Sequence, residues 1–506
     1  MRSGFRVVAV SAIVAVAALV GRADVPPTVE AAQVQLQLGN LLFEEGRFNE
    51  ALEAYLKAVR ADDHTLVRQA RAGVIQSALR VAEFATARTE AELLFQDDPR
   101  SASAISLYAD ALWACGLFDQ AEQKYHDALA LAPQQARGLH GLARSLASKG
   151  QLDRALDQAQ AALHLAPRDL EIHHTVGTIY ERMHRFEEAA AAYGNFVNLL
   201  PNKDRSDKAA WSRAEIRFLR SFGQKVPFQM DPGSDEMLYT VDFNLVNDKV
   251  VVRARINDAS PQDFIVDTGS ENTVLSRQTA QRLGVTPVTY TLSAGVGEIG
   301  LRGLQLARLE SFEIGTLKIH NVPCLIKNPP LKDIPTRETE SFSPLALGFS
   351  MTIDYKTRKL TIGKKLPSEP KDFELPLRLY RLATVSGTVD QDHLANFVVD
   401  TGGEVISISQ AMATTLPRVA QVTRKIPLKV YGTSGWDRDA FLLPGVDLAF
   451  DAIRFNNFPV VVLNLDAPSA LLGFQLGGIV GHKFLSKYRV GIDLDGSVLR
   501  LKQISS

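Results

Sequence analysis

Apolar and polar positions follow two different periods along this chain. From about residue 32 to residue 202 the apolar positions have helical spacing, and the pattern repeats about every 34 residues. Residues 224–236 are rich in Pro, Gly and polar side chains, and beyond them apolar and polar positions alternate as in strands. The pattern therefore predicts a repetitive helical region, 32–223, joined by a linker to a β-rich region.

Small residues define the register of the helical repeats. One position, where paired helices approach closely, is occupied by Gly39, Ala109, Ala143 and Gly177, and a second by Ala51, Ala87, Ala121, Ala155 and Ala189. This pattern resembles the tetratricopeptide repeat. It predicts five repeats, of which the second is the most degenerate because Ile75 stands where a small residue is expected. The segment 207–222 is expected to cap the last repeat.

The repeat array is expected to present a groove. Stacked repeats bury their apolar sides against one another and form a superhelix with a concave face. The resemblance implies that this face docks a peptide or a protein partner. A rigid spacer or assembly platform without a ligand is the alternative.

The β-rich region contains one short motif twice. Phe264–Ser270 and Phe397–Gly403 are apolar runs that end in Asp-Thr-Gly, and each is followed by a second β-rich run. A single Asp-Thr-Gly usually marks a turn. Two copies with matching flanks are harder to explain as two chance turns. The two stretches resemble the catalytic loops of aspartic proteases of the retropepsin and pepsin types. The resemblance implies a multidomain α + β protein with a tetratricopeptide α-solenoid and two retropepsin-like all-β lobes, at 237–365 and 373–504.

Two glycine-containing hairpins are candidates for the flap that covers substrate in such enzymes. One lies in lobe 1 at Gly295 and Gly297, and the other lies in lobe 2 at Tyr431 and Gly432. A phosphate-binding loop is another interpretation of the first, but the strand-to-helix context and later glycine of a dinucleotide fingerprint are absent. The sequence leaves open which hairpin closes over substrate.

Each lobe is also expected to have a floor beneath its catalytic loop. In aspartic proteases an apolar pair followed by glycine passes under the loop, and Leu347-Gly348 and Val480-Gly481 resemble that element. Lobe 1 then lacks a counterpart of residues 482–487, which follow in lobe 2. A less regular floor is therefore expected in lobe 1.

Two carboxylates explain why the motif would be needed twice. Hydrolysis of a peptide bond without a covalent intermediate needs one group to take a proton from water and another to give a proton to the carbonyl oxygen. Two close carboxylates can do both, because they share one proton over a broad acidic range. The resemblance assigns Asp267 and Asp400 to this pair, which titrates as a unit.

The other motif residues are expected to support this pair. By resemblance, the hydroxyls of Thr268 and Thr401 cross between the loops and hold them together. Gly269 and Gly402 allow the backbone to turn sharply and to approach the carboxylates.

The residue after each motif is expected to tune the pH dependence. Ser270 supplies a hydroxyl that would favour the charged carboxylate, whereas Gly403 does not. With one loop so equipped, the expected activity optimum lies roughly between pH 4 and 6.

The combined prediction is an aspartic-type endopeptidase whose repeat array docks a protein substrate or partner. One alternative is that the lobes are catalytically inactive and the array is a scaffold for protein–protein interaction. Another is that the lobes process a single partner docked on the array. The substrate sequence and the oligomeric state are not specified by the sequence.

Composition narrows the range of ligands. The chain has 46% apolar and 22% charged residues and a net charge of −1, which gives no indication of nucleic-acid binding. The ten histidines are scattered, and Cys115 and Cys324 lie in different predicted domains. No metal, no cofactor and no disulfide framework is therefore expected.

The N-terminus has the features of a targeting segment. Arg2 and Arg6 precede an apolar run, and Gly21 and Ala23 place small residues at a cleavage position. The run is short for a membrane span. It predicts a cleaved signal peptide at residues 1–23 and a periplasmic or secreted mature protein without a membrane span, with an uncleaved N-terminal anchor as the alternative.

Overall fold

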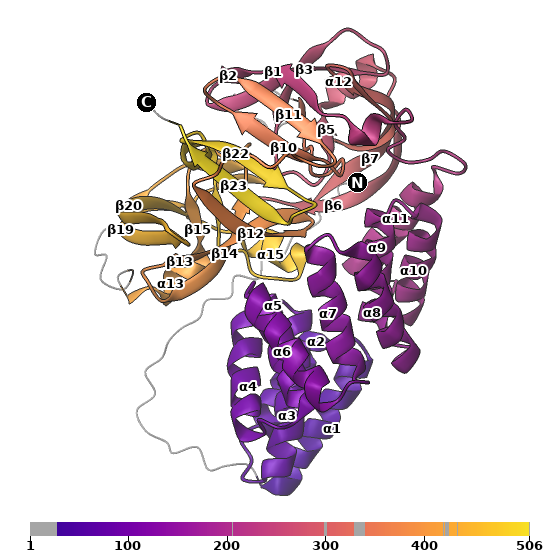
Figure 1. Ribbon diagram of the computed structural model, residues 1–506. Helices are drawn as coiled ribbons and strands as arrows, with labels where there is room; N and C mark the ends of the chain where they lie inside the picture. Colours follow the sequence, from indigo (N-terminus) through magenta and orange to yellow (C-terminus); the bar gives the residue numbers. More distant parts are fainter. Residues whose placement is uncertain are drawn as a thin grey trace, which may run out of the picture.

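A computed structural model of the chain describes residues 28–204, 206–297, 301–327, 340–417, 419, 425–432 and 434–504. The expected signal peptide, residues 1–23, lies outside these ranges. In Figure 1 the helical region, coloured indigo to magenta, lies against the β-rich region, coloured magenta-pink through orange to yellow.

The helical region is a series of antiparallel helix pairs followed by one further helix. Its members are α1 (Val29–Glu44), α2 (Phe48–Ala58), α3 (His64–Arg80), α4 (Phe84–Asp97), α5 (Ala102–Ala114), α6 (Phe118–Leu131), α7 (Ala136–Ser148), α8 (Leu152–Leu165), α9 (Leu170–Arg182), α10 (Phe186–Leu199) and α11 (Asp207–Arg220). Ser101 begins α5 by accepting a hydrogen bond from Ala104 N–H, and Gly116, in the left-handed conformation, turns the chain into α6. The predicted helical solenoid is confirmed, and α11 follows its last helix pair.

Large and small side chains alternate between paired helices. A Cβ on Gly39 would lie 2.6 Å from the ring of Tyr55, so only glycine admits the tyrosine in the first repeat. In the second repeat Ala91 occupies the position of Tyr55, and the fully buried Ile75 packs in the same cluster. The larger residue at position 75 thus accompanies a smaller one on the facing helix, which explains the apparent degeneracy of this repeat.

The two ends of the repeat array touch each other. Asn202, after α10, donates a hydrogen bond to the carbonyl of Glu45, which follows α1. Arg80 at the end of α3 forms an ion pair with Glu171 at the start of α9. The concave face is therefore bounded by contacts between early and late repeats.

The β-rich region follows in chain order. Its first part contains η1 (Ser234–Glu236), β1 (Tyr239–Asp242), β2 (Asn244–Val246), β3 (Lys249–Ile256), β4 (Gln262–Val266), β5 (Thr273–Leu275), α12 (Arg277–Arg282), β6 (Pro287–Ala294), β7 (Leu301–Ile314), β8 (Leu317–Ile326), β9 (Glu340–Phe342), β10 (Ser350–Asp354) and β11 (Lys359–Gly363). Its second part contains β12 (Phe373–Tyr380), β13 (Leu382–Val389), β14 (His393–Val399), β15 (Ser407–Ser409), α13 (Gln410–Thr415), β16 (Ile426–Pro427), β17 (Val430–Gly432), β18 (Gly435–Asp437), β19 (Phe441–Phe450), β20 (Ile453–Leu463), α15 (Asp466–Leu472), β21 (Gly478–Val480), α16 (His482–Leu485), β22 (Tyr488–Asp493) and β23 (Val498–Gln503).

The two parts repeat one topology. In lobe 1, β9 is parallel to β4 and antiparallel to β5, and β5 is parallel to β8. In lobe 2, β21 is parallel to β14 and antiparallel to β15, and β15 is parallel to β20. Both Asp-Thr-Gly motifs therefore follow equivalent strands, β4 and β14.

The closing strands of the two lobes form a shared sheet. β10 pairs with β22 through Met351 opposite Ile492 and Ile353 opposite Val490. Within the described residues, one sheet consequently runs β1-β11-β10-β22-β23-β12 and continues into lobe 2. All four of these side chains are buried in one core that both lobes contribute to. The lobes are thus held together within one chain.

Buried contacts fix the solenoid on lobe 2. Arg378 on β12 is 6% exposed and donates hydrogen bonds to Glu122 at 2.7 Å and to Ser145 Oγ at 3.2 Å. Phe118 at the start of α6 packs edge-on against Phe474, with ring centroids 5.0 Å apart. The buried, partnered charge of Arg378 and the apolar contact of Phe118 together fix the orientation of the solenoid relative to lobe 2.

The predicted linker, 224–236, lies against lobe 1. Gln229 forms an antiparallel bridge with His320 on β8, with its N–H donating to the His320 carbonyl at 3.1 Å. Phe228 packs against the buried cores of both lobe 1 and the end of the solenoid. This segment therefore adds to the contact between the two regions.

Candidate active site

The two Asp-Thr-Gly loops sit on equivalent floors. Asp267 follows β4, and its N–H donates to the carbonyl of Phe342 on β9 at 2.9 Å. Asp400 follows β14, and its N–H donates to the carbonyl of Val480 on β21 at 3.0 Å. In each lobe the strand under the loop therefore holds the backbone of the aspartate.

This arrangement corrects the predicted floor of lobe 1. The strand beneath the first loop is β9, Glu340–Phe342, and Leu347-Gly348 lies in a turn after it. Residues 344–348 occupy the chain position that α16 occupies after β21, so lobe 1 does have a segment matching the one expected to be missing. The pattern misled because Glu340 is polar. It is 7% exposed, and its carboxylate accepts a hydrogen bond from Ser276 Oγ at 2.8 Å.

The threonines cross between the loops in both directions. Thr268 Oγ1 donates to the Val399 carbonyl at 2.6 Å and accepts from Thr401 N–H at 3.0 Å. Thr401 Oγ1 donates to the Val266 carbonyl at 2.7 Å and accepts from Thr268 N–H at 3.1 Å. Both threonines are buried, so these four bonds satisfy polar groups that water does not reach.

The glycines bring each loop against the opposite carboxylate. A Cβ on Gly269 would lie 2.5 Å from Cγ of Asp400, and a Cβ on Gly402 would lie 2.5 Å from Oδ1 of Asp267. Such distances leave no room for a larger residue. The structure therefore brings together the predicted pair, Asp267 and Asp400, and the predicted supporting residues around it.

The two carboxyl groups have unequal surroundings. Burial, the charge of Asp400 and a hydrogen bond shared with Asp400 raise the pKa of Asp267 to about 7, against the opposing effects of Lys249 and Lys327. Oδ1 of Asp267 accepts from Gly269 N–H at 3.1 Å. These surroundings favour the protonated form of Asp267.

The second carboxyl group receives more backbone donors. Oδ1 of Asp400 accepts from the N–H groups of Gly402 and Gly403, both at 2.8 Å. Hydrogen bonds to a carboxylate favour its charged form. Asp400 is therefore the better placed of the two to carry the negative charge.

The predicted role of Ser270 is wrong in this structure. Its hydroxyl donates to the carbonyl of Asn272 at 2.9 Å rather than to the carboxyl group of Asp267 or Asp400. Gly403, which was expected to contribute nothing, supplies a backbone N–H to Asp400. The side chains alone predicted that the first loop would stabilise a charged carboxylate better than the second. Backbone N–H donors, which that prediction left out, reverse the order.

The two candidate flap hairpins meet at their tips. Gly295 N–H donates to Ser434 Oγ at 3.0 Å, and Ser434 N–H donates to the Val296 carbonyl at 3.0 Å. A Cβ on Gly297 would lie 2.3 Å from the Ser434 backbone, and one on Gly432 would lie 2.3 Å from the Val296 carbonyl oxygen. The β6–β7 and β17–β18 hairpins are thus in contact, so lobe 1 and lobe 2 each contribute one.

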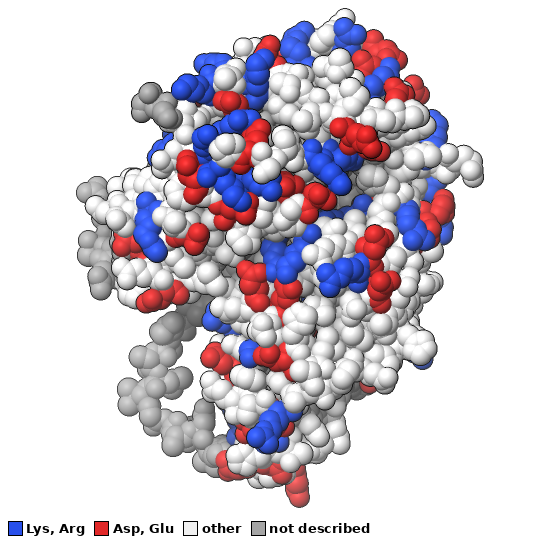
Figure 2. All heavy atoms as spheres, in the orientation of Figure 1, with Lys and Arg blue, Asp and Glu red and all other residues white. Residues whose placement is uncertain are grey.

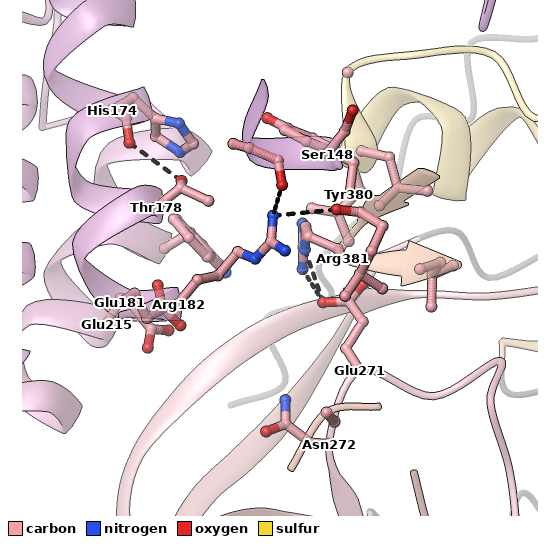
Figure 3. Close-up of a pocket in the computed structure, with 18 of the residues that line it drawn as sticks. Ser148, His174, Thr178, Glu181, Arg182, Glu215, Glu271, Asn272, Tyr380 and Arg381 are labelled. Carbon is pink, nitrogen blue, oxygen red and sulfur yellow. Dashed lines mark hydrogen bonds and ion pairs between the residues drawn. The ribbon is translucent and has the colours of Figure 1, made fainter. Parts of the chain in front are cut away.

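A cavity of about 1370 Å³ connects the first Asp-Thr-Gly loop with the concave face of the solenoid. Asp267 and Gly269 line it from lobe 1, and Tyr431 and Gly432 line it from the lobe 2 hairpin. Side chains of α9 and α11 line the opposite side (Figure 3). The volume exceeds the roughly 300–1,000 Å³ typical of small-molecule pockets. The solenoid is therefore a wall of the site, which the sequence did not indicate.

An ion pair at the cavity joins the first loop to lobe 2. Glu271, which follows Ser270, pairs with Arg381 at 2.6 Å between Oε2 and Nη2. Arg381 lies in the turn between β12 and β13 and reaches over the Trp211 ring of α11, 5.8 Å from its centroid. Sequence reasoning missed both residues. A charged residue directly after the motif was the signal available for Glu271, and none marked Arg381.

Among the described residues, no group of three or more His, Cys, Asp or Glu side chains is placed to hold a metal ion. On the face drawn in Figure 2, basic and acidic side chains are interspersed. No helix among the described residues is both long enough and apolar enough to cross a membrane.

Comparisons with known proteins agree with the two regions. The aspartyl protease family matches residues 252–350, and the tetratricopeptide repeat family matches residues 32–65. A comparison with curated proteins finds no match. The chain therefore contains an aspartyl protease domain and tetratricopeptide repeats.

Solved structures with similar folds include several repeat proteins. A thermophilic repeat protein of Thermus thermophilus is 22% identical, covering 37% of this chain and 99% of its own, with a TM-score of 0.32. PilF of Pseudomonas aeruginosa is 18% identical, covering 38% of this chain and 93% of its own, with a TM-score of 0.27.

Proposed function

We propose that the chain is an aspartic endopeptidase that hydrolyses peptide bonds with a water molecule held between Asp267 and Asp400. The observation that carries the proposal is the reciprocal set of four hydrogen bonds that holds the two Asp-Thr-Gly loops face to face. A noncatalytic turn has no need of such a face-to-face arrangement.

The unequal carboxyl groups suggest a division of roles. Asp400 accepts two backbone N–H groups on one oxygen. It takes a proton from the water while the water oxygen attacks the carbonyl carbon of the substrate. Asp267, whose pKa is raised, gives its proton to the carbonyl oxygen. The proton now on Asp400 passes to the amide nitrogen as the C–N bond breaks, and a hydroxyl proton of the intermediate returns to Asp267.

The solenoid contributes to substrate selection in this proposal. Its concave face and the first catalytic loop line one cavity, so a bound polypeptide would touch both. The volume suits an extended segment of several residues rather than a folded domain. Docking and cleavage would then take place in one continuous site rather than on two separate surfaces.

Export is part of the proposal. Residues 1–23 have the pattern of a cleaved signal peptide, which would place the enzyme in a periplasmic or extracellular compartment. Intact-mass measurement of protein recovered from a secreting host checks this, since cleavage removes these residues. A full-length mass in that fraction would favour the uncleaved anchor.

One assay tests the activity. The chain without residues 1–23 is incubated with a mixed peptide library, with and without the aspartic-protease inhibitor pepstatin, and new termini are identified by mass spectrometry. Cleavage that pepstatin suppresses is expected. Absence of cleavage in the library, together with intact binding of peptides, would favour the alternative of inactive lobes on an interaction scaffold.

A further inference from the structure

The cavity contains a second pair of acidic side chains, away from the catalytic loops. Glu181 lies at the end of α9, and Glu215 lies on α11. Both line the cavity, and Figure 3 draws their carboxyl groups next to each other on the solenoid side. Glu271 and Arg381 lie across the cavity from them (Figure 3). The proposed mechanism uses neither Glu181 nor Glu215.

Among the described residues, Glu215 lacks a partner of its own. It is 7% exposed, and no hydrogen bond or ion pair joins it to any other described residue. Glu181 accepts a hydrogen bond from the Tyr193 hydroxyl at 2.7 Å. A carboxyl group that is more than nine-tenths buried without a partner costs free energy. Because Glu215 lines the cavity, a ligand bound there would supply the missing partner.

The nearby Arg381 does not act as the partner of Glu215. Burial raises the pKa of both glutamates, and the charge of Arg381 only opposes that shift, because its guanidinium is bound to Glu271 through two contacts of 2.6 and 2.7 Å. Arg182 donates instead to the carbonyls of Ala147 and Leu379. Burial and the neighbouring carboxylates raise the pKa of Glu215, so an added positive charge would be favourable at this point.

The ligand chemistry follows from the geometry. Two carboxyl groups offer several acceptor oxygens within one small region, which suits the three donors of an ammonium group. A divalent metal is less well served, since no group of three or more potential ligands occurs among the described residues. The cavity also reaches Asp267, so a peptide at the catalytic loop can extend to this wall.

We propose that Glu181 and Glu215 form a subsite that binds the ammonium group of a peptide substrate, either the N-terminal amine or a lysine side chain. This inference rests on the proposed peptidase function for its choice of ligand. It adds that the enzyme selects substrates by a positive charge at a fixed distance from the bond that is cut.

Binding of synthetic peptides tests the subsite separately from catalysis. The full chain carrying Asp400→Asn is titrated calorimetrically with four peptides of one sequence: a free amine without lysine, its N-acetylated form, the acetylated form with one lysine, and the same with norleucine. At least one ammonium-bearing peptide should bind about tenfold more tightly than its neutral counterpart. Which of the two pairs shows the difference identifies the source of the ammonium.

Variants then assign the preference to the two glutamates. Glu215→Gln, and Glu181→Gln with it, should reduce the ratio of dissociation constants toward one. Glu53→Gln, an exposed glutamate on α2 that does not line the cavity, is the matched control and should leave the ratio unchanged. Replacing an unpartnered buried carboxyl by an amide is not expected to unfold the chain, and circular dichroism checks this.

Each outcome decides between the two proposals. Equal binding of charged and neutral peptides, or a preference that survives the double substitution, overturns the subsite. Wild-type cleavage without charge preference would leave the peptidase standing and remove the subsite. A charge preference in binding without cleavage by the wild type would keep the subsite and remove the peptidase.

Discussion

The two lobes carry the same tripeptide on the same floor, yet they surround its carboxyl group differently. The hydrogen bonds of Thr268 and Thr401 are reciprocal to within 0.1 Å in both donor and acceptor roles. By contrast, Oδ1 of Asp400 accepts two backbone N–H groups at 2.8 Å, and Oδ1 of Asp267 accepts one at 3.1 Å. The loops are therefore alike as scaffolds and unlike as electrostatic environments.

The difference originates at the residue after the motif. A Cβ at Gly403 would lie 2.7 Å from Oδ2 of Asp400, so glycine lets the backbone come close enough to donate. Ser270 has a Cβ, and its hydroxyl is used within its own turn. An absent side chain can therefore strengthen a hydrogen-bonding environment, because it exposes the peptide N–H.

The largest effect is expected from replacing either aspartate of the two loops. Asp267→Asn and Asp400→Asn should each lower kcat by at least about a thousandfold, because hydrolysis needs both an acid and a base. Although the two carboxyl groups have unequal surroundings, both variants should lose activity to this extent. Steady-state kinetics on the best library peptide measures this. Turnover above a few per cent of wild type in either correctly folded variant would contradict the shared mechanism.

The next effect probes the close approach of the loops. Gly269→Ala and Gly402→Ala place a Cβ 2.5 Å from the opposite carboxyl group, so both should lose about a hundredfold or more in activity and about 2 kcal/mol or more in stability. Gly194→Ala on α10, where a Cβ would meet nothing within 4 Å, is the control and should not destabilise the fold. Chemical denaturation gives the stabilities. Unimpaired activity in either loop variant would show that the loops are not in contact.

The pairing of Asp267 and Asp400 could be predicted from the sequence because the motif is local and repeated. The aspartate, threonine and glycine identities, the helical repeats and the hairpins are all set within short stretches, so each could be predicted. The floor of lobe 1 could not, because Glu340 looks polar in the sequence and its partner Ser276 is distant along the chain. A buried charge in a strand is recognisable only when its hydrogen-bond partner is known.

The relation between solenoid and lobes was also beyond the sequence. Arg378 reads as one basic residue of an alternating strand, but it is buried between β12 and the helices α6 and α7. The linker composition suggested separation, whereas Phe228 and Gln229 pack against lobe 1. Contacts between surfaces leave no period or spacing in the sequence, so the shared cavity emerged only from the structure.

The third prediction concerns the raised pKa of Asp267 and its effect on the pH dependence of stability. Because the folded-state pKa of Asp267 is raised to about 7 from its ordinary value near 4, its protonation stabilises the fold fully below pH 4, and this contribution is lost as the pH rises through 7. Asp267→Asn should thus match wild type at pH 4 and exceed it by up to about 4 kcal/mol at pH 8. Thermal unfolding across pH measures it, and an advantage that does not grow with pH would count against the raised pKa.

The smallest effect tests the likeness of the lobes. Thr268→Val and Thr401→Val each leave a carbonyl and an N–H without a partner, so each should cost about 2 kcal/mol, and the two costs should agree within about 0.5 kcal/mol. Thr240→Val, which removes an exposed hydroxyl contact with Thr361, should change stability by less than about 0.5 kcal/mol. Clearly unequal costs for the two loop threonines would mean that one loop depends on the cross-links more than the other.

The most direct measurement is a carbon-13 NMR titration of the aspartate carboxyl carbons in the full chain, repeated with Asp267→Asn. One carboxyl group should titrate near pH 7 and be missing from the variant, because burial and Asp400 keep Asp267 protonated to that pH. A wild-type spectrum in which every aspartate has finished titrating by about pH 5 would contradict it. In that case the two loops would not hold a shared proton, and the proposed division between acid and base would fall.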